Sequence, residues 1–297
     1  MDVVILFGGS SSERLVSVAS AQNVASLLPD AACWFLSKSG SVHVVSREEL
    51  SAHAKPFENE FFPKAAATFA SIDAALSDGA TKGKTFLLAL HGGEGENGTL
   101  QARFEKHGVA FTGSGSAASA RAFDKAVTKT LVGAKGAKLA PAHVLEPMEA
   151  AALEQKLRAL FDEAPRWVLK PVADGSSVGL FHLTSKELVS EAAKQVSASK
   201  LRYLAEAFIT GRELTVGVVD EAGGPVALPV SEVRLIPGGA FDYAGKYLGK
   251  GTEELTPAPI TPALKRSVWP TAQAVMKPPW LQPPMPRRSG SATPSAT

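Results

Sequence analysis

Three short apolar runs in this chain end in loops rich in glycine, and this pattern constrains the fold more than any other feature of the sequence. The runs cover residues 3–7, 85–90 and 167–169. Apolar runs of this length are typical of buried strands, and the glycine-rich text after them is typical of turns. Loops at the carboxyl ends of strands in an open α/β sheet are where ligands bind. The sequence therefore predicts an α/β fold with a ligand site built from these loops, and the alternation of strands and helices over residues 1–112 favours a parallel sheet there.

The third loop combines a cation with small residues. Lys170 and Pro171 close the apolar run, and an Asp-Gly-Ser-Ser turn follows at residues 174–177. Backbone N–H groups beside a lysine suit phosphate oxygens, because nothing larger than serine blocks their approach. The lysine precedes the loop, so this is not the Walker P-loop, and residues 8–10 lack the G-x-G-x-x-G spacing of a dinucleotide-binding fold. Taken alone, the segment leaves open a phosphate site or an ordinary strand–turn–strand connection.

A helical pattern follows the first loop. Its approximate apolar stripe, which runs up to Pro29, consists of Leu15, Val18, Ala19, Val24 and Leu27. Ser10 with Glu13 three residues later matches a capping box. On these residues alone, we interpret Glu13 as a capping residue.

Composition gives no support for several classes of partner. The 31 basic and 29 acidic side chains leave a net charge of +2, which gives no electrostatic reason to expect nucleic acid or a membrane as a partner. Cys33 is the single cysteine, which rules out an internal disulfide and suits a reducing cytosol. No run approaches the roughly 20 apolar residues of a membrane span, and the chain starts with a strand-like run and no signal peptide. We expect a cytoplasmic protein.

Six segments, in order, make the chain similar to the D-alanine–D-alanine ligases of the ATP-grasp superfamily. The segments are Gly8-Gly9-Ser10-x-x-Glu13-Arg14, His91-Gly92-Gly93-x-Gly95-Glu96-Asn97-Gly98-Thr99, Thr112-Gly113-Ser114-Gly115 with Asp124-Lys125, Leu169-Lys170-Pro171 with Gly175-Ser176-Ser177-Val178-Gly179, Glu206 with Gly211-Arg212-Glu213-Leu214-Thr215-Val216, and Phe241-Asp242-Tyr243 with Lys246-Tyr247. Any one of them is weak evidence, whereas six in the correct order are specific. The resemblance implies an ATP-grasp fold with an N-terminal parallel α/β lobe and a truncated C-terminal lobe.

By this resemblance, the substrate-binding residues are Glu13, His91, Lys246 and Tyr247. Glu13 would bind the ammonium group of the first D-alanine, and His91 would lie near the carboxylate of that substrate. Lys246 and Tyr247 lie on a segment that resembles the mobile loop over the second substrate. Ser176 would link Glu13 to Tyr247 in a polar network, so the implied catalytic residues are Glu13, Ser176 and Tyr247. Taken alone, Tyr247 is also compatible with a partly buried aromatic side chain.

The same resemblance implies an ATP site. Its residues would be Lys125, Lys170, Gly175, Ser176, Ser177, Glu206, Ala207, Phe208, Ile209 and Glu213. The two lysines would hold phosphates as point charges, and the residues from 175 to 177 would form the loop that closes over them. Residues 206–209 resemble the hinge at the adenine edge, and Glu213 resembles the carboxylate that accepts from the ribose hydroxyls. Without the resemblance, both glutamates are compatible with solvated residues that flank a strand.

The implied reaction joins two D-alanine molecules into the dipeptide of bacterial peptidoglycan. The γ-phosphoryl group of ATP passes to a carboxylate, with Mg²⁺ (or Mn²⁺) bridging the phosphates, and the amine of the second D-alanine displaces phosphate from the acyl phosphate. The resemblance also implies a homodimer. Two alternatives stay open: an ATP-grasp ligase for another acceptor such as D-lactate, and a non-catalytic paralogue that binds ATP or D-alanine. The Lys246-Tyr247 pair resembles the dipeptide-forming members.

The C-terminal end departs from the family pattern. Members continue with an Arg-x-Asp strand and a Glu-x-Asn segment, whose Asp, Glu and Asn bind Mg²⁺. This chain has no Asp or Glu after Glu254 and no Asn after Asn97. Hard cations need oxygen ligands of this kind, so we predict that the family's metal ligands are missing here.

The last residues suggest a division of the chain and a cause for the departure. Residues 277–297 contain six prolines and no apolar periodicity, which predicts a disordered, aberrant tail. We hypothesise a shifted reading frame near Met276, with natural divergence as the alternative, and the coding DNA distinguishes them. The predicted units are an N-terminal substrate lobe (1–112), a central ATP-grasp lobe (113–205), an incomplete C-terminal ATP-grasp lobe (206–276) and the tail. We expect the incomplete lobe to expose apolar surface.

Overall fold

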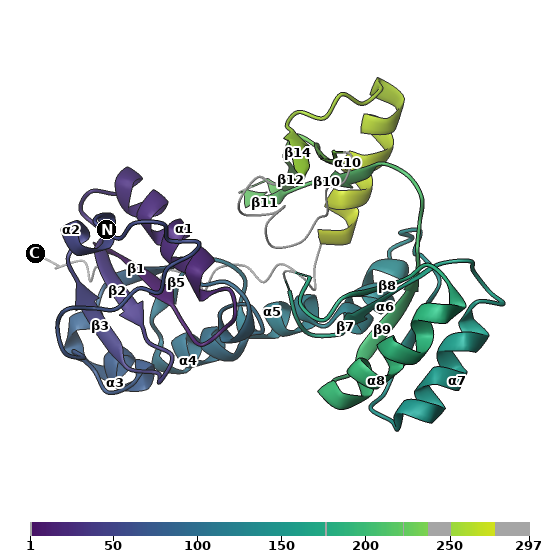
Figure 1. Cartoon of the computed structure of the whole chain (residues 1–297). Coiled ribbons are helices and arrows are strands. Elements are labelled where there is room, and N and C mark those ends of the chain that lie inside the picture. Colours follow the sequence, from purple (N-terminus) through teal and green to yellow (C-terminus); the bar gives the residue numbers. More distant parts are fainter. Residues whose placement is uncertain (1, 176, 222, 237–250, 277–297) are drawn as a thin grey trace, which may run out of the picture.

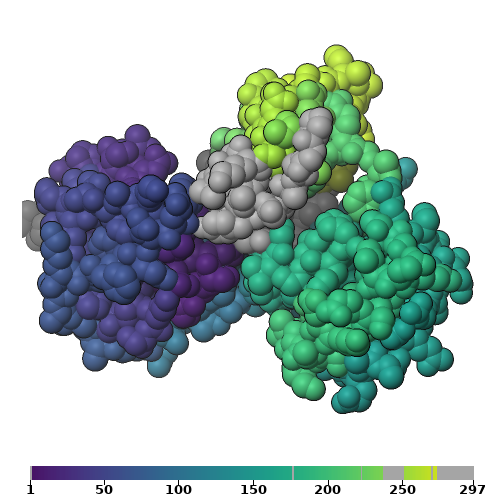
Figure 2. All heavy atoms as spheres, viewed as in Figure 1, coloured from purple at the N-terminus to yellow at the C-terminus, as the bar shows by residue number. Residues whose placement is uncertain are grey.

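The computed structural model describes residues 2–175, 177–221, 223–236 and 251–276. Figure 1 shows three bodies along the chain: an N-terminal body in purple and blue, a central body in teal and green, and a small body in green and yellow. The space-filling view separates the same three bodies (Figure 2). The predicted tail, 277–297, lies outside the described residues.

A five-stranded sheet forms the centre of the N-terminal body, in the order β3-β2-β1-β4-β5. Its strands are β1 (Asp2–Gly8), β2 (Ala32–Leu36), β3 (Val42–Val45), β4 (Lys84–Leu88) and β5 (Ala110–Phe111). Four of them run parallel, whereas β3 at the edge runs antiparallel to β2. The predicted parallel sheet is therefore confirmed, with one antiparallel strand added at an edge, as is common in doubly covered sheets.

Both faces of this sheet are covered, which explains why β1 is a continuous apolar run. Successive side chains of a strand point to opposite faces, so Val4 and Leu6 belong to one apolar cluster and Ile5 and Phe7 to the other. Helix α4 (Thr99–His107) contributes to the first cluster, and helix α1 (Arg14–Leu27) contributes to the second. The remaining helical segments of this body are α2 (Arg47–Ser51), α3 (Ile72–Ser77), η1 (Gly79–Thr81) and η2 (Gly93–Gly95).

The central body is a four-stranded antiparallel sheet covered on one face by two helices. Its strands lie in the order β6-β9-β7-β8. The elements are α5 (Ser116–Phe123), α6 (Lys125–Gly133), β6 (Ala142–Leu145), α7 (Ala150–Leu160), β7 (Trp167–Pro171), β8 (Phe181–Leu183), η3 (Lys186–Leu188), α8 (Val189–Ser199) and β9 (Tyr203–Ala207). Apolar side chains of α7 and α8 pack on Trp167, whose indole nitrogen donates to the Leu160 carbonyl at 2.9 Å. Strand β9 spans both sides of the predicted division at residues 205 and 206.

The third body has little buried apolar surface. It contains a three-stranded sheet, β10-β13-β14, a hairpin of β11 and β12, and helix α10. Their bounds are β10 (Glu213–Thr215), β11 (Val218–Glu221), β12 (Gly224–Ala227), β13 (Ser231–Leu235), β14 (Thr252–Leu255) and α10 (Pro262–Met276). Among the residues after Ala207 whose burial the structure describes, Val230 is the one apolar side chain that is buried, and Leu235 and Ile236 are exposed. In the described part of the chain, no helix has the length and apolar character needed to cross a bilayer.

Candidate functional site

A buried serine joins the carboxyl ends of β1 and β4, where the first two glycine-rich loops begin. The Ser17 hydroxyl accepts from the Gly8 backbone N–H and donates to the Ala89 carbonyl, both at 2.7 Å. Gly8 has φ +98°, and a Cβ atom there would lie 2.4 Å from the Leu36 carbonyl oxygen, so only glycine fits this turn. The loops at residues 9–13 and 91–98 therefore leave the sheet side by side.

Ser11 brings the backbones of Glu13 and His91 together. Its hydroxyl donates to the His91 carbonyl at 2.5 Å and accepts from the Glu13 backbone N–H at 3.1 Å. The His91 ring is held from the other side, because its Nε2 lies 2.8 Å from the Ser20 hydroxyl of α1. His91 and residues of α1 also line an open pocket of about 690 Å³. The structure thus places two of the predicted substrate-binding residues in adjacent loops.

The Glu13 carboxylate lies where three loops meet. The side chain is only 7% exposed. A Cβ atom at Gly92 would lie 2.5 Å from its Oε2 atom, and a Cβ atom at Gly175 would lie 3.0 Å from the same oxygen. The third loop, which comes from the central body, therefore approaches Glu13 closely. Gly92 also has φ +65°, which favours glycine there, whereas a side chain at Gly175 would crowd the carboxylate and push it aside.

The capping-box interpretation of Glu13 is wrong. Helix α1 begins at Arg14 with Glu13 itself at the N-cap position, so Glu13 cannot be the third helical residue that a capping box needs. Ser10 lies outside the helix, and its hydroxyl donates to Glu94 at 3.4 Å. The Ser-x-x-Glu spacing matches the motif, but the helix begins only at Arg14. The chain before it turns at Gly8 and Gly9, both of which have positive φ.

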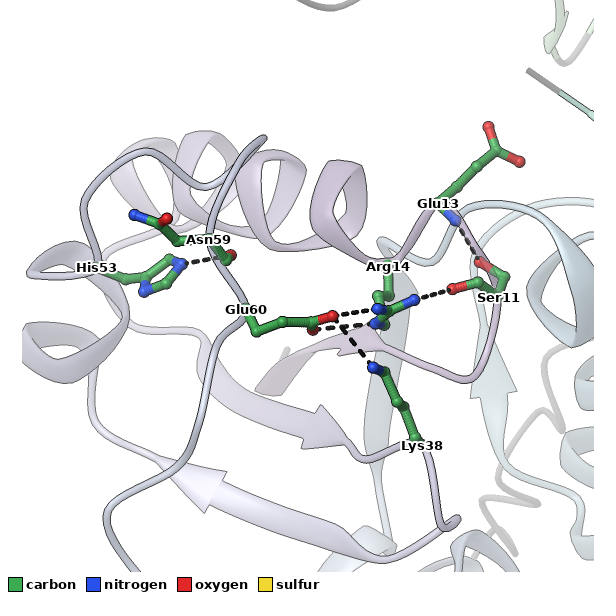
Figure 3. A network of polar contacts seen from close by, with 7 residues as sticks. All are labelled: Ser11, Glu13, Arg14, Lys38, His53, Asn59 and Glu60. Carbon is green, nitrogen blue, oxygen red and sulfur yellow. Dashed lines mark hydrogen bonds and ion pairs between the residues drawn. The ribbon is translucent and has the colours of Figure 1, made fainter. Parts of the chain in front are cut away.

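A second network holds the same loop from the outside, as Figure 3 shows. Arg14 donates from Nε to Glu60 at 3.0 Å and from Nη1 to the Ser11 carbonyl at 3.1 Å, and Lys38 also contacts Glu60 at 3.1 Å. The hydrogen bond from Arg14 holds the pKa of the Glu60 carboxyl below its usual value. Sequence reasoning assigned no role to Glu60, because it lies 46 residues from Arg14 in a segment without a motif.

The predicted phosphate lysines lie on the face of the central sheet opposite α7 and α8. Trp167 and Leu169 of β7 face the α7–α8 layer, so Lys170 between Leu169 and Pro171 points to the opposite face. The register of β7 and β9 puts Glu206 opposite Val168, which places Glu206 diagonally across from Lys170 on that same face. Glu206 accepts hydrogen bonds from Lys170 and from Lys129 of α6.

Lys125 reaches the same region from the start of α6. Asp124 caps this helix by accepting from the backbone N–H groups of Ala126 and Val127, each at 2.9 Å. The Lys125 ammonium group donates to the Asp174 carbonyl in the third loop at 2.5 Å. Burial and the neighbouring positive charge of Lys170 together lower the pKa of Lys125. Both effects disfavour its charged form. An anion placed between the two lysines would offset their mutual repulsion and favour the charged form of Lys125.

The predicted adenine and ribose residues lie at the end of β9 and at the start of β10. Glu206 and Ala207 end β9, and the Phe208 N–H donates to the Arg166 carbonyl at 3.0 Å. Ile209 is 67% exposed, which leaves an apolar side chain available to a planar ligand. Glu213, at the start of β10, is also exposed. Its neighbour Arg212 forms a bidentate ion pair with Glu232 at 2.6 and 2.7 Å, which ties this segment to β13.

The chain resembles known proteins over most of its length. The family model described as "D-ala D-ala ligase N-terminus" matches residues 2–114, and the model described as "D-ala D-ala ligase C-terminus" matches residues 138–278. A D-alanine–D-alanine ligase of Leptospira interrogans is 32% identical over 282 residues, covering 87% of this chain and 76% of that protein. A D-alanine–D-alanine ligase of Bordetella petrii is 33% identical over 267 residues, covering 90% and 71%.

The chain belongs to the D-alanine–D-alanine ligase family. Solved structures agree on the fold. The VanG D-Ala:D-Ser ligase of Enterococcus faecalis matches with a TM-score of 0.72 at 24% identity, covering 93% of this chain and 82% of that one. The D-alanine–D-alanine ligase of Coxiella burnetii matches with a TM-score of 0.70 at 22% identity, covering 93% and 77%. The chain is therefore an ATP-dependent ligase with the predicted ATP-grasp fold.

Some family residues named from the sequence lie outside the described part of the chain. These are Ser176, Lys246 and Tyr247. Ser177 is described and has φ +60°, the left-handed conformation that a tight phosphate-binding turn often needs. Lys129 was missed by sequence reasoning, although it follows Lys125 by four residues and so shares a helix face with it. That spacing is the signal that would have found it.

The described residues do not fit the Mg²⁺ ion that the family resemblance implies. Within the described ranges, no three His, Cys, Asp or Glu side chains come close enough together to hold a metal ion. Glu206 lies beside Lys170, and it already accepts from two ammonium groups. We therefore assign no step of the reaction to a metal held by these residues.

Proposed function

We propose that this chain binds ATP on the face of the central sheet opposite α7 and α8, and D-alanine beside Glu13, as a ligase that forms D-alanyl-D-alanine. The observation on which this rests most heavily is the position of the Glu13 carboxylate. It lies against Gly92 of the N-terminal body and Gly175 of the proposed phosphate loop. A carboxylate at that junction would hold a substrate ammonium group within reach of the transferred phosphoryl group.

The proposed chemistry has two steps. In the first, the carboxylate of one D-alanine attacks the γ-phosphorus of ATP, and ADP leaves. In the second, the amine of the other D-alanine attacks the acyl phosphate, loses a proton and displaces inorganic phosphate. Lys125 and Lys170 would stabilise the negative charge of the phosphates, since phosphoryl transfer depends chiefly on positioning and charge. Glu13 would orient the first substrate by pairing with its ammonium group.

Ligation by this chain is proposed to be slow or absent, because its last segment contributes no carboxylate. No Asp or Glu follows Glu254, and the described residues hold no metal-binding cluster. The competing proposal is a non-catalytic paralogue that binds ATP and D-alanine without joining them. The same two observations favour it, so the two proposals differ in what a restored C-terminal segment would do.

Two measurements test these proposals. Calorimetry with ATP, with and without Mg²⁺, measures binding, and phosphate release with ATP, Mg²⁺ and D-alanine measures turnover, with D-lactate as the competing acceptor. Both are repeated on a version whose residues from 277 onward are replaced by the matching segment of an active relative. We expect ATP binding in both proteins and D-alanine-dependent phosphate release in the restored version. A restored protein that binds ATP but stays inactive supports the paralogue, and no ATP binding in either protein rejects both proposals.

A further inference from the structure

The Glu206 carboxylate is shared between two ammonium groups. Lys129 of α6 donates to its Oε1 atom, and Lys170 of β7 donates to its Oε2 atom. The three side chains are 19–27% exposed, so water screens them only in part. Burial raises the pKa of Glu206, but the hydrogen bonds and charges of the two lysines outweigh it and leave that pKa below its usual value. The carboxylate is therefore ionised and paired on both oxygens.

The two lysines differ in their position relative to the third glycine-rich loop. Lys170 lies at the end of β7, next to the third glycine-rich loop and close enough to Lys125 for their charges to interact. Lys129 lies one helical turn after Lys125, inside α6, and its partner is Glu206. A phosphate group between Lys125 and the loop would thus compete with Glu206 for Lys170. Lys129 contacts the other oxygen of the carboxylate and would keep that contact.

We infer that Lys129 is the permanent partner of Glu206 and a positioning residue of the nucleotide site, and that Lys170 is exchanged from Glu206 to the ATP phosphates. The inference rests on the proposed function, because it needs ATP phosphates near Lys170. Lys129 itself touches no phosphate in this arrangement. Its contribution is to keep Glu206 paired when Lys170 moves away.

Charge pairing explains why such a partner is needed. A partly buried carboxylate that loses its last cation keeps the desolvation cost without the compensating attraction. Without Lys129, the transfer of Lys170 to a phosphate would leave Glu206 in that state, so Glu206 would retain Lys170 and oppose ATP binding. With Lys129 present, the same transfer leaves one ion pair intact. The side chain therefore lowers the cost of releasing Lys170.

The test compares dissociation constants for ATP and for adenosine, measured by calorimetry. The proteins are the wild type, Lys129→Met, Glu206→Gln and the double variant. We expect Lys129→Met to weaken ATP binding about tenfold, or about 1.4 kcal/mol, and to change adenosine binding by less than about twofold. Adenosine has no phosphate and leaves Lys170 on Glu206. In the Glu206→Gln background, Lys129→Met should change ATP binding by less than about twofold, because no carboxylate competes for Lys170.

Controls separate the possible failures. Lys135→Met removes an exposed lysine just after α6 and should leave both dissociation constants unchanged, and thermal melts check that each variant folds. An equal loss of ATP affinity in the Glu206→Gln background means that Lys129 contacts phosphate directly, and the inference is wrong. A parallel loss for adenosine, or no loss for ATP, also overturns it. Failure of the wild type to bind ATP rejects the proposed function itself.

Discussion

At the scale of single residues, the two roles considered for Glu13 now separate. The helix begins after Glu13 and no side chain caps it, so the capping-box role is removed. What remains is a carboxylate, 7% exposed, held against two glycines from different loops. At this position the carboxylate faces both the first two glycine-rich loops and the proposed phosphate loop. In the proposed function this carboxylate binds the ammonium group of the first substrate.

Glu13→Gln should therefore impair D-alanine binding and spare ATP. Gln keeps the size of the side chain but loses the charge, and a charged hydrogen bond is worth about 1.5–3 kcal/mol, so we expect at least a tenfold weaker affinity for the first D-alanine. Calorimetry measures this in the present chain, and the KM for D-alanine measures it in the restored version. Glu48→Gln, an exposed change in α2, is the matched control. An unchanged D-alanine affinity would show that Glu13 is structural.

A second prediction at this scale concerns pH. Hydrogen bonds from Arg212, opposed by burial, and then those from Arg234, lower the pKa of Glu232 to about 2. The ordinary carboxyl pKa is about 4.3, so the stability that Glu232 contributes is complete above that value. It is lost as the pH falls from about 4.3 towards 2.

Glu232→Gln should lower the melting temperature at pH 6 and have a shrinking effect as the pH falls through this window. The melting temperatures of the variant and the wild type, compared from pH 6 to pH 2.5, measure this difference. Glu221→Gln, at an exposed position of β11, is the control for removing one negative charge. A difference that stays constant across the window would mean that the ion pairs of Glu232 add no pH-dependent stability.

At the scale of elements, the ends of β1 and β4 are fixed to α1 by Ser17. Ser17→Ala would leave the Gly8 N–H and the Ala89 carbonyl without this partner in a buried place. Each unsatisfied buried group costs about 1–3 kcal/mol, so we expect a loss of at least that much in the free energy of unfolding of the N-terminal body. Ser26→Ala, whose exposed hydroxyl donates only to Asn23 of the same helix, should change stability far less. Urea unfolding of both variants makes the comparison, and equal losses would contradict the bridging role.

The apolar runs and the glycine-rich turns after them made the main elements predictable. The apolar run in β1 is buried on both faces, and the glycines at its end adopt positive φ, so both signals were local. Glu60 and Lys129 were missed for different reasons. Glu60 reaches Arg14 through a long loop that no local pattern predicts. Lys129 becomes a partner of Glu206 only when α6 is placed over the central sheet, which depends on tertiary packing.

At the scale of the whole molecule, the proposed site is assembled from distant parts of the chain. The first two glycine-rich loops belong to the N-terminal sheet, and the third belongs to the central sheet, yet all three meet at the Glu13 carboxylate. Lys125 at the start of α6 contacts the third loop through the Asp174 carbonyl. Glu13, which would bind the substrate ammonium group, and the phosphate lysines lie in different bodies. The proposed reaction therefore depends on how these bodies are joined.

Stability is unevenly distributed among these bodies. The N-terminal and central bodies each contain large apolar clusters, whereas after Ala207 Val230 is the one buried apolar side chain among the residues whose burial is described. Regions with few buried apolar contacts open with a small free energy. We therefore expect backbone amides of β13 and β14 to exchange with deuterium far faster than those of β1 and β9.

Hydrogen exchange followed by mass spectrometry tests this expectation peptide by peptide. In the present chain, β13 and β14 should exchange within minutes, while β1 and β9 stay protected for hours, since their opening approaches global unfolding. ATP should slow exchange at the end of β9 if it binds there. In the version with a restored C-terminal segment, β13 and β14 should become protected as well, because the added residues would cover exposed side chains such as Leu235 and Ile236. Equal protection of β13 and β1 in the present chain would show that the third body is stable without that cover.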